Sequence, residues 1–306
     1  MSELSKRILV AVIGIPITLA VVYIGGFVFF FAIILLSNLV LWEFFNLGER
    51  KAINPFSYFG MIYSSFLLTT YYLLQQNSLN IDKFTALILF IILIAILPPL
   101  FLVVQIWNKS QNTTISTAYT LLGIYWVAFA FLSLLSIRFL PDYYQLLAYI
   151  GNIPQNSQII YQRTILDKYW STKFFIAILG TIWLCDTFAY FIGTAYGKHK
   201  LAPKTSPKKS WEGAIAGFVG AIISFSLLDI LFKLNLPITF QLLFGSIVGV
   251  IGQIGDLAES KIKREFNVKD SSNILPGHGG FLDRLDSIMF VYPATLLAIT
   301  LPFLFG

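Results

Sequence analysis

The sequence predicts an all-α integral membrane protein, a polytopic bundle of about nine transmembrane helices with a polar site that faces the cytosol. Of its 306 residues, 57% are hydrophobic and only 12% are charged, and the mean hydropathy is +0.77. Soluble domains carry roughly 25% charged residues. The apolar runs continue over about 20 residues without alternating, which favours membrane helices over a barrel.

Nine segments are long and apolar enough to cross a bilayer. They are residues 8–25, 27–47, 56–75, 84–106, 115–139, 174–196, 212–233, 239–256 and 285–305. Gly25-Gly26 predicts a tight turn between the first two, and Pro98-Pro99 predicts a kink or a shortening of the fourth. Cys185 is the only cysteine. It lies in an apolar segment, so we expect a buried side chain and no intrachain disulfide.

The chain divides into a five-span region (1–139), a polar non-cytosolic loop (140–173) and a four-span region (174–306). With a cytoplasmic N-terminus and nine crossings, 15 of the 21 lysines and arginines fall on the cytoplasmic side. This bias, with anionic lipid headgroups, explains the formal charge of +6 better than nucleic-acid binding does. We expect a bacterial inner (plasma) membrane protein with no nucleic-acid partner. A homodimer is compatible with the sequence.

Asp186 lies near the middle of its predicted span, where a charge costs roughly 2.5–3.5 kcal/mol on insertion scales. Gly193 and Gly197 follow one helical turn apart on one face, and such a stripe of small residues suits helix packing. Packing does not account for the acid. Asp186 is therefore a candidate for a polar site, and structural pairing with a cation is the alternative.

A lysine-rich stretch, residues 198–213, leads directly into the next predicted helix. Ser206, Lys208 and Lys209 precede the start of that helix, where free N–H groups attract anions. The stretch predicts phosphate binding, while a topology signal and a polybasic lipid contact are the alternatives. It is not a P-loop, because the Gly-x4-Gly-Lys-Ser/Thr spacing is absent.

The most charged stretch, residues 254–286, holds several carboxylates between two apolar segments. Asp256 ends one span, Glu259 lies one turn beyond, and Asp283 and Asp286 are three residues apart, which on a helix places them on one side. Such oxygens suit Mg²⁺ together with phosphates. Zinc fits poorly, because the chain has two histidines and a remote cysteine. An ion-pair cluster with Arg284 at a helix start is the alternative.

These motifs carry a resemblance. The run from Ser260 to Asp286 resembles the signature of phosphatidate cytidylyltransferases (CDP-diacylglycerol synthases). It reads SKIKR, four residues, KD, and then LPGHGGFLDRLD. The stretch Ser206–Gly213 and the run Asp186–Tyr190 are similar to other motifs of that family. The specific match covers about residues 180–290, and the first five spans match only in being hydrophobic.

The resemblance implies that CTP and phosphatidic acid give CDP-diacylglycerol and pyrophosphate. On this basis Asp256 and Asp283 hold one or two Mg²⁺ ions, and Asp286 lies close by. Lys208 and Lys209 neutralise the triphosphate, and Ser206 and Lys269 also bind the nucleotide. The phosphatidate headgroup or the α-phosphate is held by Lys263, Arg264 and Arg284. His278, which lies in a turn with Gly279 and Gly280, donates to a phosphate oxygen. Asp186 binds metal or nucleotide.

Two rival functions differ in what they require of the sequence. A CTP-dependent lipid kinase, for instance a polyprenol kinase, would transfer the γ-phosphate to a hydroxyl, and the full match through Asp286 argues against it. A transporter would place polar residues along several spans and would show a repeat between halves. Apart from Asp186, the charge here is confined to predicted helix ends and loops on the cytosolic side.

Overall fold

Helices cover all nine apolar segments in a computed structural model that describes residues 3–76, 83–106, 113–140, 162, 167 and 169–305. The first five are α1 (Glu3–Ile24), α2 (Gly26–Glu49), α3 (Ser57–Gln75), α4 (Lys83–Gln105) and α5 (Thr113–Arg138). The remainder are α8 (Trp170–Tyr196), α9 (Trp211–Phe232), α10 (Ile238–Ile247), η2 (Val248–Gly252), α11 (Gln253–Glu265), α12 (Leu282–Leu285) and α13 (Ile288–Phe305).

Within these described ranges, six helical stretches are long and apolar enough to cross a membrane. An all-α membrane protein is therefore confirmed, and the number nine stays a prediction. Most of the predicted loop 140–173 lies outside the described residues.

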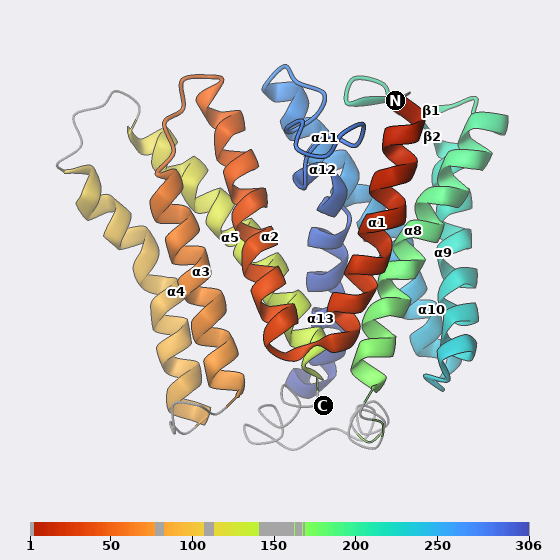
Figure 1. The fold of residues 1–306 in the computed structure, drawn as a ribbon, viewed down its shortest axis with the longest axis horizontal. Helices are drawn as coiled ribbons and strands as arrows, with labels where there is room; N and C mark the ends of the chain where they lie inside the picture. The colour runs from red at the N-terminus through yellow and green to blue at the C-terminus, as the bar shows by residue number, and fades with distance from the viewer. Residues whose placement is uncertain are drawn as a thin grey trace.

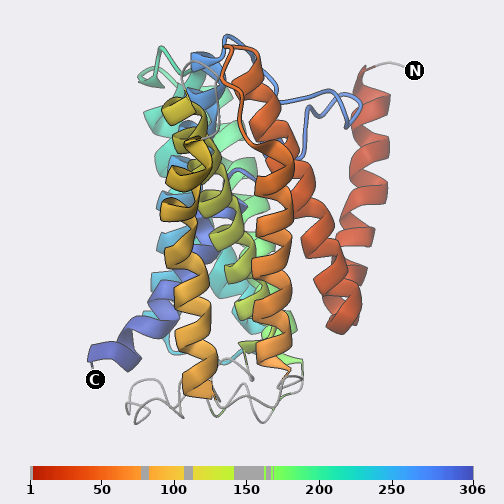
Figure 2. The ribbon, with the colours of Figure 1, turned by 90° about the vertical axis from the view of Figure 1, so that its left-hand side faces the viewer.

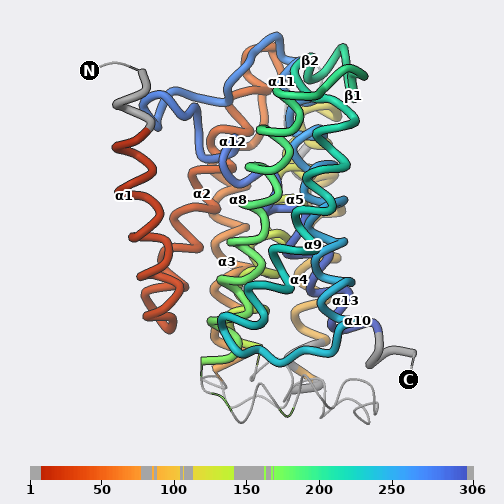
Figure 3. The backbone as a smooth tube through the Cα atoms, turned by 90° about the vertical axis from the view of Figure 1, so that its right-hand side faces the viewer, coloured from red at the N-terminus to blue at the C-terminus, as the bar shows by residue number. Residues whose placement is uncertain are grey.

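The helices run side by side from one end of the molecule to the other (Figure 1). Helix α13 contacts α5, α10 and η2. In Figure 1 it lies between helices α2–α5 on the left and α8–α10 on the right. Helix α1 stands apart from the bundle, next to α2 (Figure 2). The start of α1, the helices α11 and α12 and a small hairpin gather at one end, and α13 finishes at the other (Figures 1 and 3).

The predicted turn between the first two helices is confirmed. Gly25 and Gly26 adopt φ angles of 65° and 51°, a region that glycine enters without steric cost. The Arg138 side chain covers this turn, and its Nε donates to the carbonyl oxygen of Val22 at 2.8 Å. An arginine from α5 thus satisfies a carbonyl at the last turn of α1.

Helix α4 continues through Pro98 and Pro99. Proline has no N–H, so Pro98 leaves the carbonyl of Ile94 without its partner in the helix. The hydroxyl of Tyr125 on α5 donates to that oxygen at 3.0 Å. A neighbouring helix therefore replaces the missing hydrogen bond, as prolines in membrane helices require.

Small residues bring α8 and α9 into close contact, as the glycine stripe predicts. A Cβ on Gly213 would lie 2.7 Å from the carbonyl oxygen of Ala189 and 2.9 Å from the Cα of Gly193. Cys185 is buried nearby with a free thiol, as expected. Van der Waals packing of this kind is the main force between helices in lipid.

Two local features differ from the sequence prediction. The span expected to end at residue 256 continues as helix through a π-helical segment, Val248–Gly252, to Glu265. Asp256 and Glu259 consequently lie on a helix and not in a loop. The lysine-rich stretch forms an antiparallel hairpin of β1 (Lys200–Ala202) and β2 (Ser206–Ser210), although an all-α chain was expected.

The contact between α8 and α9 predicts the effect of one added methyl group. Gly213→Ala should lower the free energy of unfolding by about 1–3 kcal/mol, because its Cβ collides with backbone that cannot move freely. Gly14→Ala is the matched control, since a Cβ there meets no atom within 4 Å. Thermal unfolding in detergent measures both, and equal midpoints for the two variants would contradict the prediction.

Candidate active site

The hairpin is attached to the start of α9 by one carboxylate and one hydroxyl. Glu212 accepts from the backbone N–H of Lys198 at 3.1 Å and lies 2.6 Å from the His199 ring. The hydroxyl of Ser210 caps the helix by accepting from the N–H of Gly213 at 3.2 Å. These contacts hold Lys208 and Lys209 immediately before the helix.

Lys209 reaches from the hairpin to the first turn of α11. Its Nζ lies 2.5 Å from Oδ2 of Asp256, and both side chains are partly exposed. Asp186 on α8 interacts electrostatically with Asp256, Lys209 and Arg284. Asp286 interacts with Asp256, Asp186 and Lys209. We call these five residues the outer cluster; it combines three carboxylates from three segments with two cations.

Asp283 lies in different surroundings from Asp286. Its Oδ1 accepts from Nζ of Lys263 at 2.6 Å, and its Oδ2 accepts from the N–H of Gly280 at 2.7 Å and the hydroxyl of Ser271 at 3.0 Å. Nζ of Lys263 also lies 2.8 Å from Oε2 of Glu259, one turn back on α11. Asp283, Lys263 and Glu259 are all buried. This arrangement is a buried ion-pair network that joins α11, α12 and the loop between them.

A third buried carboxylate, Glu43 on α2, holds the same loop from the other side. Its Oε1 accepts from the hydroxyl of Ser272 at 2.7 Å and the N–H of Phe281 at 2.9 Å. Its Oε2 accepts from the hydroxyl of Ser271 at 2.9 Å and the N–H of Leu282 at 2.7 Å. The side chain is fully buried. Glu43 therefore ties the N-terminal region to the charged loop.

The sequence analysis did not identify Glu43. The signal was a single acid inside an otherwise apolar run, seven residues before Arg50. Such an acid also suits an interfacial position at a span end, so the pattern alone does not identify a buried partner.

The loop between α11 and α12 encloses a polar pocket of about 520 Å³. Lys269, Asp270, Asn273, His278 and Arg284 provide its polar side chains. Nε of Arg284 donates to the carbonyl oxygen of His278 at 3.0 Å, which fixes the arginine at the pocket rim. We call this space the loop pocket; three of its five polar side chains are cations or a histidine, which suits an anionic ligand.

The remaining predicted site residues lie around the hairpin and the loop, and Arg264 contacts backbone in both. Nε and Nη1 of Arg264 donate to the carbonyl oxygens of Thr205 and Val268 at 3.2 and 2.8 Å, which links α11 to the hairpin and the loop. Gly279 and Gly280 approach carboxylates closely, because a Cβ on either glycine would collide with Asp283 or Glu43. Ser206 starts β2 opposite Ala202, and Lys208 is exposed on the same strand.

The outer cluster supplies the oxygen ligands that Mg²⁺ prefers. Within the described part of the chain, no three acidic, histidine or cysteine side chains already converge as a metal site. The ammonium group of Lys209 occupies one oxygen of Asp256 instead. The ammonium group of Lys209 therefore already offsets part of the negative charge of the outer cluster, whose carboxylates would suit a metal ion.

The four hydrogen bonds to Glu43 predict that its amide analogue is destabilising. Each oxygen faces one backbone N–H, so whichever way a glutamine turns, its NH₂ group meets a donor. Glu43→Gln should lower the free energy of unfolding by about 1–3 kcal/mol. The control is Glu49→Gln on the same helix, where the side chain is exposed. If both variants melt at the wild-type temperature in detergent, the described role of Glu43 is wrong.

Comparison with known proteins shows which family combines these motifs. The chain matches the model of the cytidylyltransferase family over residues 5–301. It is 30% identical over 293 residues to a phosphatidate cytidylyltransferase of Staphylococcus saprophyticus, covering 94% of this chain and 95% of that protein.

Two further relatives match over a shorter region. The phosphatidate cytidylyltransferases of Bacillus subtilis and Staphylococcus haemolyticus are 48% and 51% identical over 112 residues, which is 37% of this chain. These alignments span 42% and 43% of the two relatives, less than half of their length. On the match that extends from residue 5 to residue 301, the chain belongs to the cytidylyltransferase family.

Proposed function

We propose that this protein is a phosphatidate cytidylyltransferase, which transfers the cytidylyl group of CTP to phosphatidic acid. The products are CDP-diacylglycerol and pyrophosphate, as expected for phospholipid biosynthesis. The observation that carries the proposal is the outer cluster. The carboxylates of Asp186, Asp256 and Asp286 interact electrostatically with one another and with Lys209, and Asp186 also interacts with Arg284. The relatives that match this chain bear the name of that activity.

The reaction joins two polyanions. A phosphate oxygen of phosphatidic acid attacks the α-phosphorus of CTP, and the bond to the β-phosphate breaks to release pyrophosphate. A phosphate monoester has a second pKa near ~6, so the attacking phosphate needs no strong general base at cytosolic pH. Charge neutralisation is the remaining task, and preorganised cations perform it best. Lys208 and Lys209 would serve the triphosphate, and Arg284 the phosphate of the lipid.

Magnesium fits the outer cluster by the chemistry of its oxygen donors. Asp186, Asp256 and Asp286 would hold one or two ions. When bound, Mg²⁺ would supply charge stabilisation to the CTP phosphates. Lys209 would then exchange Asp256 for a phosphate of the nucleotide, since its ammonium group lies at the same carboxylate.

Asp283 and Lys263 would act by positioning the loop. Both oxygens of Asp283 already accept hydrogen bonds, and Lys263 is shared between two carboxylates. The buried network therefore suits a structural role better than direct contact with metal or headgroup. It keeps Arg284, which lies within the short helix α12, and Asp286, which directly follows that helix, in fixed positions. His278 and Lys269 would contact a phosphate from the loop pocket.

The proposed orientation places the outer cluster in the cytosol, where CTP is found. The start of α1, the hairpin and the loop between α11 and α12 lie at one end (Figures 1 and 3). With nine crossings, this end holds the positively charged segments, in agreement with the positive-inside bias. A bacterial inner membrane is the expected location.

Labelled nucleotide tests the reaction. With phosphatidic acid, Mg²⁺ and CTP labelled at the α-phosphorus, the purified protein should transfer label to organic-soluble lipid. Chelation by EDTA and the substitution Asp256→Asn should each reduce that transfer at least a hundredfold. Lys204→Met, in the exposed turn of the hairpin, is the control that should stay active. Recovery of the label as CDP, with none in lipid, would favour the rival lipid kinase.

A comparison of two aspartates separates metal binding from loop positioning. Asp283→Asn should cost about 3–5 kcal/mol of stability without metal, because Lys263 loses one of its two buried anionic partners. Asp286→Asn should cost little, since it removes repulsion with Asp256 and Asp186. Saturating Mg²⁺ should raise the melting temperature of the wild type but not of Asp286→Asn. The reverse pattern would make Asp283 the ligand and Asp286 the structural residue.

A further inference from the structure

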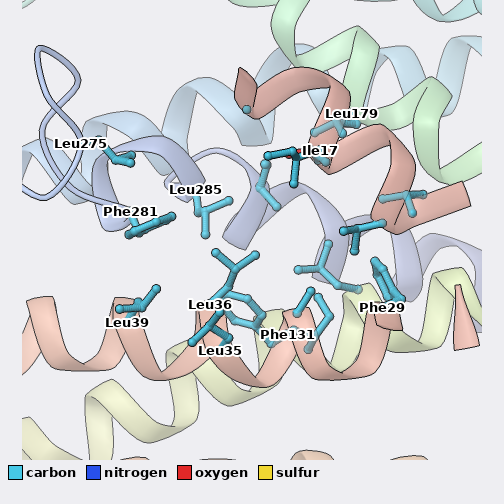
Figure 4. Close-up of a pocket in the computed structure, with 18 of the residues that line it drawn as sticks. Ile17, Phe29, Leu35, Leu36, Leu39, Phe131, Leu179, Leu275, Phe281 and Leu285 are labelled. Atoms are coloured by element: carbon cyan, nitrogen blue, oxygen red, sulfur yellow. The ribbon is translucent and has the colours of Figure 1, made fainter. Parts of the chain in front are cut away.

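An apolar cavity of about 560 Å³ separates α1 from the rest of the bundle. Its walls come from α1, α2, α5, α8 and α13, and among the described residues that line it none is charged. Figure 4 shows Leu36 and Leu39 of α2 on one side of the space and Phe281 and Leu285 on the other. Its volume is within the range of about 300–1,000 Å³ typical of ligand sites.

The cavity reaches the charged loop. Leu275 lines both the cavity and the loop pocket, so the two spaces meet at one residue. Phe281 and Leu285 line the cavity, while Asp283, Arg284 and Asp286 lie between or directly after them in the chain. A ligand that occupied both spaces would have an anionic head beside Arg284 and an apolar tail beside α1.

Helix α1 provides a wall long enough for such a tail. Its lining residues extend from Leu9 to Val22, about 20 Å at a rise of ~1.5 Å per residue. That is more than half of a hydrocarbon core of ~30 Å. Ile17 lines the cavity and is still 57% exposed, so α1 leaves room between itself and the bundle. Gly14 lies in the same wall, and a Cβ added to it would have no atom within 4 Å.

We propose that this cavity binds an acyl chain of the phosphatidic acid substrate and that α1 limits the chain length the enzyme accepts. The inference rests on the proposed function and adds the lipid part of the site. The occupant is a diacyl lipid and not a second protein copy, because the apolar space adjoins a cationic pocket at Leu275. A protein helix would leave Lys269 and Arg284 without an anionic partner.

Substitutions that fill the cavity test this directly. Gly14→Phe from one wall and Leu36→Trp from the other should shorten the space. In the labelled-CTP assay, both should reduce the ratio of kcat/KM for dioleoyl to dioctanoyl phosphatidic acid at least tenfold. Val12→Trp is the matched control, because Val12 is 64% exposed on α1 and lies outside the lining. Its ratio should equal that of the wild type.

A photoreactive substrate gives a second measurement that does not depend on a stable variant. Phosphatidic acid with a diazirine at the end of one acyl chain should label wild-type peptides from α1 or α2. Labelling confined to other helices, or an unchanged ratio in both folded cavity variants, would overturn the inference while cytidylyl transfer persists. Absence of labelled lipid from any phosphatidic acid would instead overturn the proposed function, and with it the substrate named here.

Discussion

The cost of burying charge governs this structure. In a low-dielectric interior an unpaired carboxylate is expensive, so each buried acid needs donors or a cation. Glu43 receives four hydrogen bonds, and Asp283 shares Lys263 with Glu259. Both carboxylates are held by the loop between α11 and α12, and they hold it in return. The position of that loop therefore follows from the need to satisfy two buried acids.

This constraint divides the charged residues into two sets. The inner set, Glu43, Glu259, Lys263 and Asp283, is buried, and each member contacts another part of the protein. The outer cluster has three carboxylates that interact electrostatically with one another, with Lys209 and with Arg284. Charges that repel one another are retained where a ligand can neutralise them, which is why perturbed acids gather at functional sites. The inner set joins α2, α11, α12 and the loop between the last two, which also carry Asp256, Arg284 and Asp286.

The helices were largely predictable because membrane spans depend on local composition. Continuous apolar runs, the Gly25-Gly26 turn and the glycine contact between α8 and α9 all follow from nearby residues. The motif from Ser260 to Asp286 also marked the charged loop that the structure places between α11 and α12. Neighbouring residues do not determine how acids within that motif share their partners. Asp283 and Asp286 have similar sequence surroundings, yet only Asp283 faces Lys263.

Two further features depend on contacts that no local pattern contains. The donors to Glu43 lie 228 residues or more along the chain, so its partners could not be inferred from α2. The hairpin consists of strands of three and five residues within a run of lysines, a composition that gives little strand signal. In both cases tertiary contacts, and not propensity, decide the local structure.

The separation between Glu43 and its donors has a consequence for biogenesis. At ~5–20 residues per second, the ribosome needs roughly 10–45 s to proceed from Glu43 to Ser271, 228 residues later. During that interval α2 is already made, and its acid has none of the four donors that the finished protein provides. The nascent chain must keep this carboxylate hydrated near the membrane surface. Closure of the loop onto α2 therefore belongs to the last stage of assembly, and the step that buries Glu43 is also the step that completes the site.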